Sequence, residues 1–412
     1  TSGDETGTTY TNVEGEHIII ENASDIRGAG DKKSLGMKVT GKKAEDGTET
    51  PGTITAKAAG NADITLFGKA ASDQIDIESE DLTLTSRGDI SDGNYHASNA
   101  LRVHTANGGK ISGGTFTGNT ADITNAGEMS NGDFRAEAGN MAITNDGSMT
   151  GGAYTAKNDL TYTDSEGASL SGSEFTSKEG NVDVNAKGQL ALKKLEAKGS
   201  AKVEAAGDAK LDEIKAGSVN VHAGGMLDVE TLDAAGAADL TSGGNMKLHG
   251  ATAGGHLNAE AGGSILAEGE NAKISAKDIT MKAGEDIRIT DRSLVGKLDG
   301  IDTKTPAGTT TGSGSAGSLV TGEKEGHDFD ASQKGSAQLS STGGKVTLSA
   351  KKVEIDTLKN GEGSAADLTI SADNIGIDDL AGAGAQHVTI HGADGQSQAH
   401  YAGIHSTAAG GT

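Results

Sequence analysis

Glycine recurs along this chain at a nearly constant interval, and this recurrence constrains the fold more than any other feature of the sequence. A short apolar–polar alternation precedes most of these glycines, as in "ADIT" (121–124), and a second follows, as in "MLDV" (226–229). Such a periodicity is typical of a repeat architecture. The recurring glycines lie 18 to 21 residues apart and are Gly88, Gly109, Gly127, Gly147, Gly167, Gly188, Gly207, Gly225, Gly244 and Gly263.

Large apolar residues form a second column with the same interval. Five of the ten Phe and Tyr residues of the chain occupy it, and Leu195, Ile214 and Leu232 continue it. Because a large apolar residue recurs at the same distance from each recurring glycine, these side chains should face one shared interior. We therefore expect them to form a structural ladder. The five aromatic members are Tyr95, Phe116, Phe134, Tyr154 and Phe175.

Two or three short alternating segments in about 19 residues exclude helical repeats, which need about 34 residues and a period of 3.6. Strands with period two bury one face, and glycine permits tight corners where φ can be positive. The sequence therefore predicts an all-β fold, a right-handed parallel β-helix (β-solenoid). We expect one shaft over residues 1–412, with roughly 20 coils stacked at about 4.8 Å.

Composition agrees with a long, thin core. The chain has 64 Gly, 2 Pro and neither Cys nor Trp, so the interior must be filled mainly by Val, Ile, Leu and Ala. A formal net charge of −24 disfavours nucleic acid and anionic membrane surfaces as partners. No apolar run reaches 18 residues, so we expect no membrane insertion. The start "TSGDETGTTY" lacks the pattern of a signal peptide, and we expect an excised piece of a longer protein.

Two segments interrupt the pattern, at about 29–52 and 291–338. Both are rich in Gly, Thr, Ser and charged residues, and they contain the only prolines, Pro51 and Pro306. Proline is excluded from interior ladders, so we expect loop insertions that bulge from a corner. For the second segment, a linker between two solenoids is the alternative.

Two short motifs are candidate recognition sites. The insertion at 291–338 contains "HDFD" (His327, Asp328, Phe329, Asp330), which sets an aromatic residue outside the column beside two acids. "RGD" (Arg87, Gly88, Asp89) is a candidate cell-binding corner. However, Gly88 belongs to the glycine column, and Asp89 matches Glu128, Ser148 and Asp208 of other coils. A solvated corner is therefore the simpler interpretation of this tripeptide.

The sequence predicts neither a metal site nor a cofactor. His387 and His391 in "HVTIH" would stand about 13 Å apart on one strand, too far to share a metal ion. The pairing of His400 with His405 would depend on folding that the sequence does not specify. The spacing of calcium-binding solenoid repeats is absent from "GGTFTGNTADIT" (113–124).

Catalysis is also not expected. Asp76, Glu78 and Glu80 alternate with Ile75 and Ile77, so these acids should point outward from a strand with an apolar inner face. No coil combines several acids with a basic partner and an aromatic sugar platform. No G-x-S-x-G nucleophile motif is present either.

The repeats at 217–235 ("GSVNVHAGGMLDVETLDAA") and 236–253 ("GAADLTSGGNMKLHGATA") resemble the shaft repeats of filamentous-hemagglutinin-like adhesins of the two-partner secretion type. The resemblance covers residues 60–290 well and the ends loosely. The secretion domain of that family carries Asn-Pro motifs, and this chain has none. The resemblance therefore implies a shaft fragment that lacks the secretion domain and any carboxy-terminal effector domain.

This resemblance implies a structural and adhesive segment of a large secreted bacterial surface protein. An outer-membrane β-barrel transporter is the implied partner during export, and a host-cell or bacterial surface receptor or glycan is the implied ligand. Two alternatives remain open at this point. One is an extracellular polysaccharide lyase or hydrolase built on a β-helix, and the other is the stalk of a contact-dependent toxin delivery protein.

Overall fold

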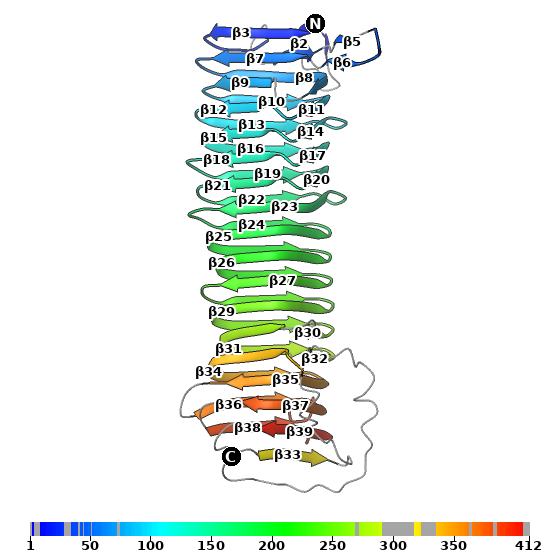
Figure 1. The fold of residues 1–412 in the computed structure, drawn as a ribbon, viewed down its shortest axis with the longest axis vertical. Coiled ribbons are helices and arrows are strands. Elements are labelled where there is room, and N and C mark those ends of the chain that lie inside the picture. Colours follow the sequence, from blue (N-terminus) through cyan, green and yellow to red (C-terminus); the bar gives the residue numbers. More distant parts are fainter. Residues whose placement is uncertain are drawn as a thin grey trace. The chain divides into compact units, whose positions relative to one another are not determined.

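The computed structural model describes residues 2–3, 9–28, 34–39, 42–43, 45–50, 52–71, 75–267, 272–290, 317–322, 335–361, 365–381 and 385–406. These residues form strands, turns and bends, with no helix among them, and hence with no helix that spans a membrane. The chain divides into two units, Thr1–Ala206 and Gly207–Thr412. Figure 1 shows the strands of each unit stacked as successive coils.

The first unit contains β1 to β25. Its strands are β1 (Ser2–Gly3), β2 (Thr9–Gly15), β3 (His17–Ala23), β4 (Leu35–Val39), β5 (Lys42–Lys43), β6 (Glu49–Thr50), β7 (Thr53–Ala58), β8 (Ala62–Ala71), β9 (Ile75–Ser79), β10 (Leu82–Ser86), β11 (Asp89–Ser91), β12 (Asn94–Ala97), β13 (Ala100–Thr105), β14 (Lys110–Ser112), β15 (Thr115–Gly118), β16 (Thr120–Asn125), β17 (Glu128–Ser130), β18 (Asp133–Ala136), β19 (Met141–Asn145), β20 (Ser148–Thr150), β21 (Ala153–Ala156), β22 (Leu160–Asp164), β23 (Ser169–Ser177), β24 (Val182–Ala186) and β25 (Leu190–Ala205).

The second unit contains β26 to β39. Its strands are β26 (Ala209–Ala223), β27 (Leu227–Ala234), β28 (Ala238–Ser242), β29 (Met246–Ala261), β30 (Ile265–Ala267), β31 (Lys273–Ala283), β32 (Asp286–Ile289), β33 (Gly317–Gly322), β34 (Gln338–Ser349), β35 (Lys352–Asn360), β36 (Ala365–Ser371), β37 (Asn374–Ala381), β38 (Ala385–His391) and β39 (Tyr401–Ser406).

Parallel pairing between successive coils builds both units. In the first unit, β10, β13, β16, β19 and β22 form one column, β11, β14, β17 and β20 a second, and β12, β15, β18 and β21 a third. The predicted parallel β-solenoid is confirmed. In the described residues its coils number about 15, fewer than the roughly 20 expected.

Alternation of apolar and polar residues decides which side chains enter the interior. On β16, Ala121, Ile123 and Asn125 are buried, whereas Asp122 is exposed. The adjacent coils repeat this register, since Ile123 pairs with Val103 of β13 and Ile143 of β19. Each coil therefore buries its apolar row against the rows of its neighbours, which makes stability a sum of coil and neighbour contributions.

The insertion predicted at 29–52 is shorter than expected. Its residues 35–39 form β4, which pairs in parallel with β2 and β8 and so belongs to the solenoid. β5 and β6, in the remainder, form an antiparallel pair of their own. Leu35, Met37 and Val39 of "LGMKV" alternate and are buried, but the segment is short and the residues around it are rich in Gly, Lys and Thr, which is why the sequence pattern assigns it to the insertion.

The second insertion also leaves the winding uninterrupted. β31 precedes it and β34 follows it, yet Ile274 pairs with Leu339 and Ile279 with Val346 across this boundary. The alternative of a linker between two solenoids at 291–338 is therefore wrong. Residues 335–338 rejoin the solenoid, while β33 pairs antiparallel with β39 within the second unit.

Candidate functional site

The five aromatic residues of the predicted ladder lie in the interior of the first unit. Each is at most 1% exposed. Ring centroids are 4.5 Å apart for Tyr95 and Phe116, 4.4 Å for Phe116 and Phe134, and 5.0 Å for Phe134 and Tyr154, all with nearly parallel rings. Phe175 meets Tyr154 edge-on at 5.5 Å. These rings stabilise the stack and offer no face to a ligand in solvent.

A row of polar residues, which the sequence analysis did not identify, also points into the interior of the first unit. Asn125 pairs in register with Asn145, and both side chains are fully buried. Asn125 Nδ2 donates to Asn145 Oδ1 at 2.8 Å, and Asn145 Nδ2 donates to the Tyr162 hydroxyl at 3.0 Å. The available signal was the recurrence of Asn after "ADIT" and "MAIT" in consecutive coils.

This buried row ends at a carboxylate. Asp164 pairs in register with Asn145 and is 8% exposed. Its Oδ2 accepts from the Tyr162 hydroxyl at 3.3 Å, and its Oδ1 accepts from the backbone N–H of Lys187. Burial raises the pKa of Asp164 above its ordinary value, although these two hydrogen bonds act in the opposite direction. The row therefore supports the fold from within.

The tripeptide Arg87–Gly88–Asp89 forms the corner between β10 and β11. The Gly88 carbonyl accepts from Ser86 Oγ and from the Lys110 N–H, each at 2.9 Å. Asp89 is exposed and pairs in register with Lys110 of the next coil, which in turn pairs with Glu128. Arg87 is half-buried, and its positive charge adds to burial in lowering the pKa of His104. The tripeptide is therefore held as a corner of the coil.

Close approach between coils explains the glycine column better than a positive φ does. A Cβ at Gly127 would overlap the carbonyl oxygen of Gly109, and a Cβ at Gly147 would overlap that of Gly127. None of these three has a positive φ, contrary to the expectation for corner glycines. Among the column glycines Gly167 has a positive φ (91), and other left-handed positions lie outside the column, including Asp92 (φ 56) and Asn131 (φ 55).

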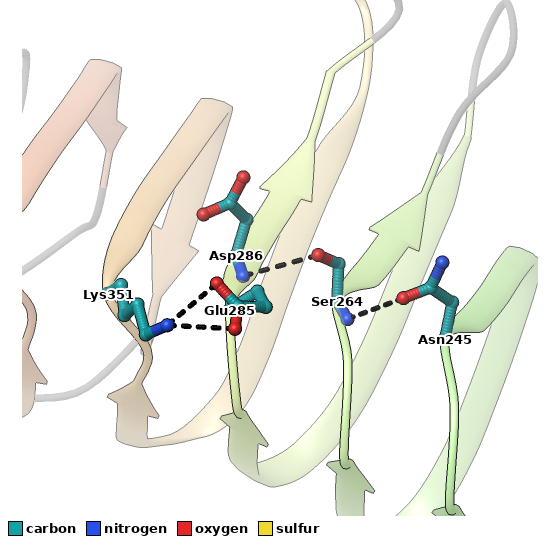
Figure 2. Close-up of polar contacts among 5 residues, drawn as sticks. All are labelled: Asn245, Ser264, Glu285, Asp286 and Lys351. Carbon is teal, nitrogen blue, oxygen red and sulfur yellow. Dashed lines mark hydrogen bonds and ion pairs between the residues drawn. The ribbon is translucent and has the colours of Figure 1, made fainter.

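Polar corners also join consecutive coils of the second unit, as Figure 2 shows. Asn245 Oδ1 accepts from the Ser264 N–H at 2.9 Å, and Ser264 Oγ accepts from the Asp286 N–H at 3.3 Å. Lys351 Nζ then lies 2.8 Å from both carboxylate oxygens of Glu285. These contacts continue across the insertion point, because Glu285 precedes the insertion and Lys351 follows it.

Exposed carboxylates on β9 meet a lysine of the preceding coil. Lys57 Nζ on β7 lies 3.3 Å from Asp76 Oδ2 and 3.2 Å from Glu78 Oε1. Hydrogen bonds to Glu78 and Asp76 raise the pKa of Lys57. As expected, Ile75 and Ile77 between these acids point inward. The basic partner was missed because it comes from an adjacent coil, but all three charged side chains are 41–48% exposed and form a solvated ion-pair row.

The histidines are spread along the described part of the chain. His387 is exposed, and its Nδ1 lies 3.5 Å from Asp367 Oδ1 on the neighbouring coil. His391 is half-buried and His400 exposed. Among the residues that the structure describes, no three His, Asp or Glu side chains are grouped so that they could hold a metal ion.

The candidate recognition loop His327, Asp328, Phe329 and Asp330 lies outside the described residues. Within the insertion predicted at 291–338, the structure describes β33 and residues 335–338. The chain matches no family model, no curated protein and no solved structure.

Proposed function

We propose that this chain is a stalk segment of a large secreted bacterial surface protein, of the filamentous-hemagglutinin-like adhesin kind. In this proposal the stacked coils hold binding regions away from the cell, and an outer-membrane transporter exports the parent protein. A receptor or glycan on a host or bacterial surface is its target. The observation that carries the proposal is that, in each unit, parallel coils stack around a filled apolar interior, in the second unit also across the insertion point.

The contacts of each unit suit a mechanical role. Every coil is tied to the next by backbone ladders and by buried rows of matched side chains, such as the stacked rings from Tyr95 to Tyr154. Exposed charged side chains also pair across coils, as Lys282 does with Glu260 at 2.7 Å. Tension along the stack would act on each coil-to-coil interface in series, and each interface is held by the hydrogen bonds and side-chain contacts of a whole coil.

The polysaccharide-cleaving alternative requires carboxylates set near the scissile bond, about 5–5.5 Å or 6.5–9.5 Å apart in glycosidases. Asp76 and Glu78 on β9 share one ion-pair partner, Lys57, on an open face, and the aromatic residues of the ladder are buried. The toxin-delivery alternative would differ from the adhesin in its effector domain. It therefore shares the stalk role proposed for this chain.

Incubation of the purified chain with a panel of acidic and neutral polysaccharides tests the proposal. We expect no new reducing ends and no unsaturated products, while binding to cells or glycans is measured separately on the same panel. Lys57→Ala serves as a matched variant, because it releases Asp76 and Glu78 without changing the interior. Turnover of any of these polysaccharides by the wild-type chain would replace the stalk by an enzyme, and a changed rate in Lys57→Ala would place the activity at β9.

A further inference from the structure

β39 is the last strand described in the second unit, and both of its edges are paired. On one edge it pairs in parallel with β37, with Asn374 opposite Tyr401 and Ile377 opposite Ile404. On the other edge it pairs antiparallel with β33, from Gly317 opposite Ser406 to Gly322 opposite Tyr401. β33 therefore occupies the place beside β39 that a further coil would take.

β33 does not belong to the winding of the solenoid. It comes from the insertion between β32 and β34, yet β34 already stacks directly on β31. Asp356 holds the two ends of this insertion together. Its Oδ1 accepts from the Thr290 hydroxyl at 2.9 Å, and its Oδ2 accepts from the Ala337 N–H at 3.4 Å. The insertion is thus closed at its base by Asp356, which lies on β35. β33 leaves this base and pairs with β39, the last described strand of the unit.

The direction of β33 also sets it apart. Coil-to-coil ladders in the described part of the chain are parallel, whereas β33–β39 is one of three antiparallel pairs, together with β1–β2 and β5–β6. The β1–β2 pair lies at the first described coil of the first unit. An antiparallel strand ends a series of parallel coils because it does not continue the winding.

The sequences of β33 and β39 explain why such a cover is needed. Neither "GSLVTG" nor "YAGIHS" contains Asp, Glu, Lys, Arg or Pro, in a chain with 94 acidic and basic residues (59 and 35). Natural proteins protect exposed strand edges with charges, with proline or with a covering segment. β39 has neither of the first two, so its protection depends on β33.

We propose that β33 is a cap that blocks self-association, and that two copies of this chain pair through their β39 strands when the cap is removed. β39 already accepts an antiparallel neighbour of six residues. The β39 strand of a second copy, related by a two-fold axis, also runs antiparallel and has the same length. Because the strand contains no Asp, Glu, Lys or Arg, the two edges can meet without the repulsion that a net charge of −24 imposes elsewhere. Such an isologous contact closes at a dimer.

The test replaces Gly317–Gly322 by an alternating Gly-Ser segment of equal length in the 412-residue chain. The matched control makes the same replacement at β5 and β6, whose strands pair only with each other among the described residues. Sedimentation velocity over about 1–100 µM protein measures association, and peptide-level hydrogen exchange measures protection of residues 401–406. Circular dichroism and thermal unfolding verify that each variant remains folded.

For the β33 variant we expect a dimer whose fraction rises with concentration. At low concentration its β39 amides should exchange at least about tenfold faster than those of the wild type, and they should regain protection in the dimer. Wild type and control should show neither change. A β33 variant that remains monomeric overturns the proposal, as do assemblies larger than a dimer. A rise on dimerisation in the hydrogen-exchange protection of β38 amides, without one in β39 amides, would also overturn it. A variant that has lost its β-rich spectrum would contradict the placement of β33 outside the winding.

If the variant is unfolded, a second one replaces residues 291–334 by a short Gly-Ser linker. The ends of this insertion are already held by Asp356, so a short linker closes them at little entropic cost. The same two measurements apply, with the same expected and opposing results.

Discussion

Individual side chains in the interior decide the register of the coils. Phe134 is packed between Phe116 and Tyr154, with ring centroids at 4.4 and 5.0 Å. Its truncation leaves a cavity between two rings that the backbone ladders hold in place. The cost should therefore lie in the upper range for core residues.

We expect Phe134→Ala to reduce the free energy of unfolding by about 3–5 kcal/mol, and Phe134→Asp to reduce it further. Asp122→Ala and Glu128→Ala are the controls, because Asp122 is exposed and Glu128 makes only a solvated ion pair with Lys110. Chemical denaturation followed by circular dichroism gives the four values. Similar losses at interior and exterior positions would show that the register is wrong.

Burial of Asp164 should make the stability of the fold depend on pH. The pKa of Asp164 in the folded chain is raised by burial above the unfolded value. Its contribution to stability is therefore fully present below the unfolded pKa and is lost as pH rises through the folded pKa. Asp164→Asn removes this titration while keeping the shape of the side chain.

The difference in unfolding free energy, Asp164→Asn minus wild type, should consequently increase as pH rises from about 3 and level off above the raised pKa. Urea unfolding at a series of pH values measures this difference. Asp122→Asn, at an exposed position, is the matched control and should show a much smaller change. A difference that does not vary with pH would mean that Asp164 is as well solvated in the folded chain as in the unfolded one.

At the scale of elements, the corner glycines fall into two kinds: those that a neighbouring backbone forces to lack a Cβ, and those with open space around them. Gly127 stacks on Gly109 so closely that a Cβ would overlap a carbonyl oxygen, whereas a Cβ at Gly188 would meet nothing within 4 Å. Both belong to the same column in the sequence. Their different surroundings in the structure give opposite expectations for the same substitution.

Gly127→Ala should lower the thermal unfolding temperature clearly, because two backbones must separate to admit the methyl group. Gly188→Ala should leave the unfolding temperature unchanged or raise it slightly. The free energy of unfolding should rise by up to about 0.4–1 kcal/mol, because alanine restricts the unfolded chain. Differential scanning fluorimetry followed by chemical denaturation measures both. Equal losses at the two positions would refute the close-approach explanation.

The sequence predicted the elements where the alternation is regular. The aromatic ladder from Tyr95 to Phe175 and the parallel coils follow from a side-chain period of two and a repeat near 19 residues. Gly167 was placed in the column but has φ 91 and lies in open space, because the turn from β22 to β23 is two residues longer than the turn from β19 to β20. Asn125 and Asn145 were missed because polar residues were assigned to the outside.

Prediction was weakest where segments far apart in the sequence meet. Lys57 joins Asp76 and Glu78 from another coil, and β33 joins β39 across about 80 residues of chain. Composition alone could not distinguish β4 from the loop around it. These contacts depend on the stacking order of the coils, which a periodic pattern does not encode.

At the scale of the whole molecule, the proposed stalk role requires the chain to transmit tension. Each unit is tied by parallel ladders that repeat from coil to coil. A pull on the two ends should therefore remove coils one after another, since each coil contacts only its neighbours. The insertion should not weaken the second unit, because β31 and β34 stack across it.

Single-molecule stretching between the two ends of the chain tests this claim most directly. We predict a series of force peaks, with extensions that are multiples of about 65 Å, the fully extended length of a coil of about 19 residues. Phe134→Ala should lower the peaks of the first unit only. Extension at forces indistinguishable from those of an unfolded polypeptide would contradict the account.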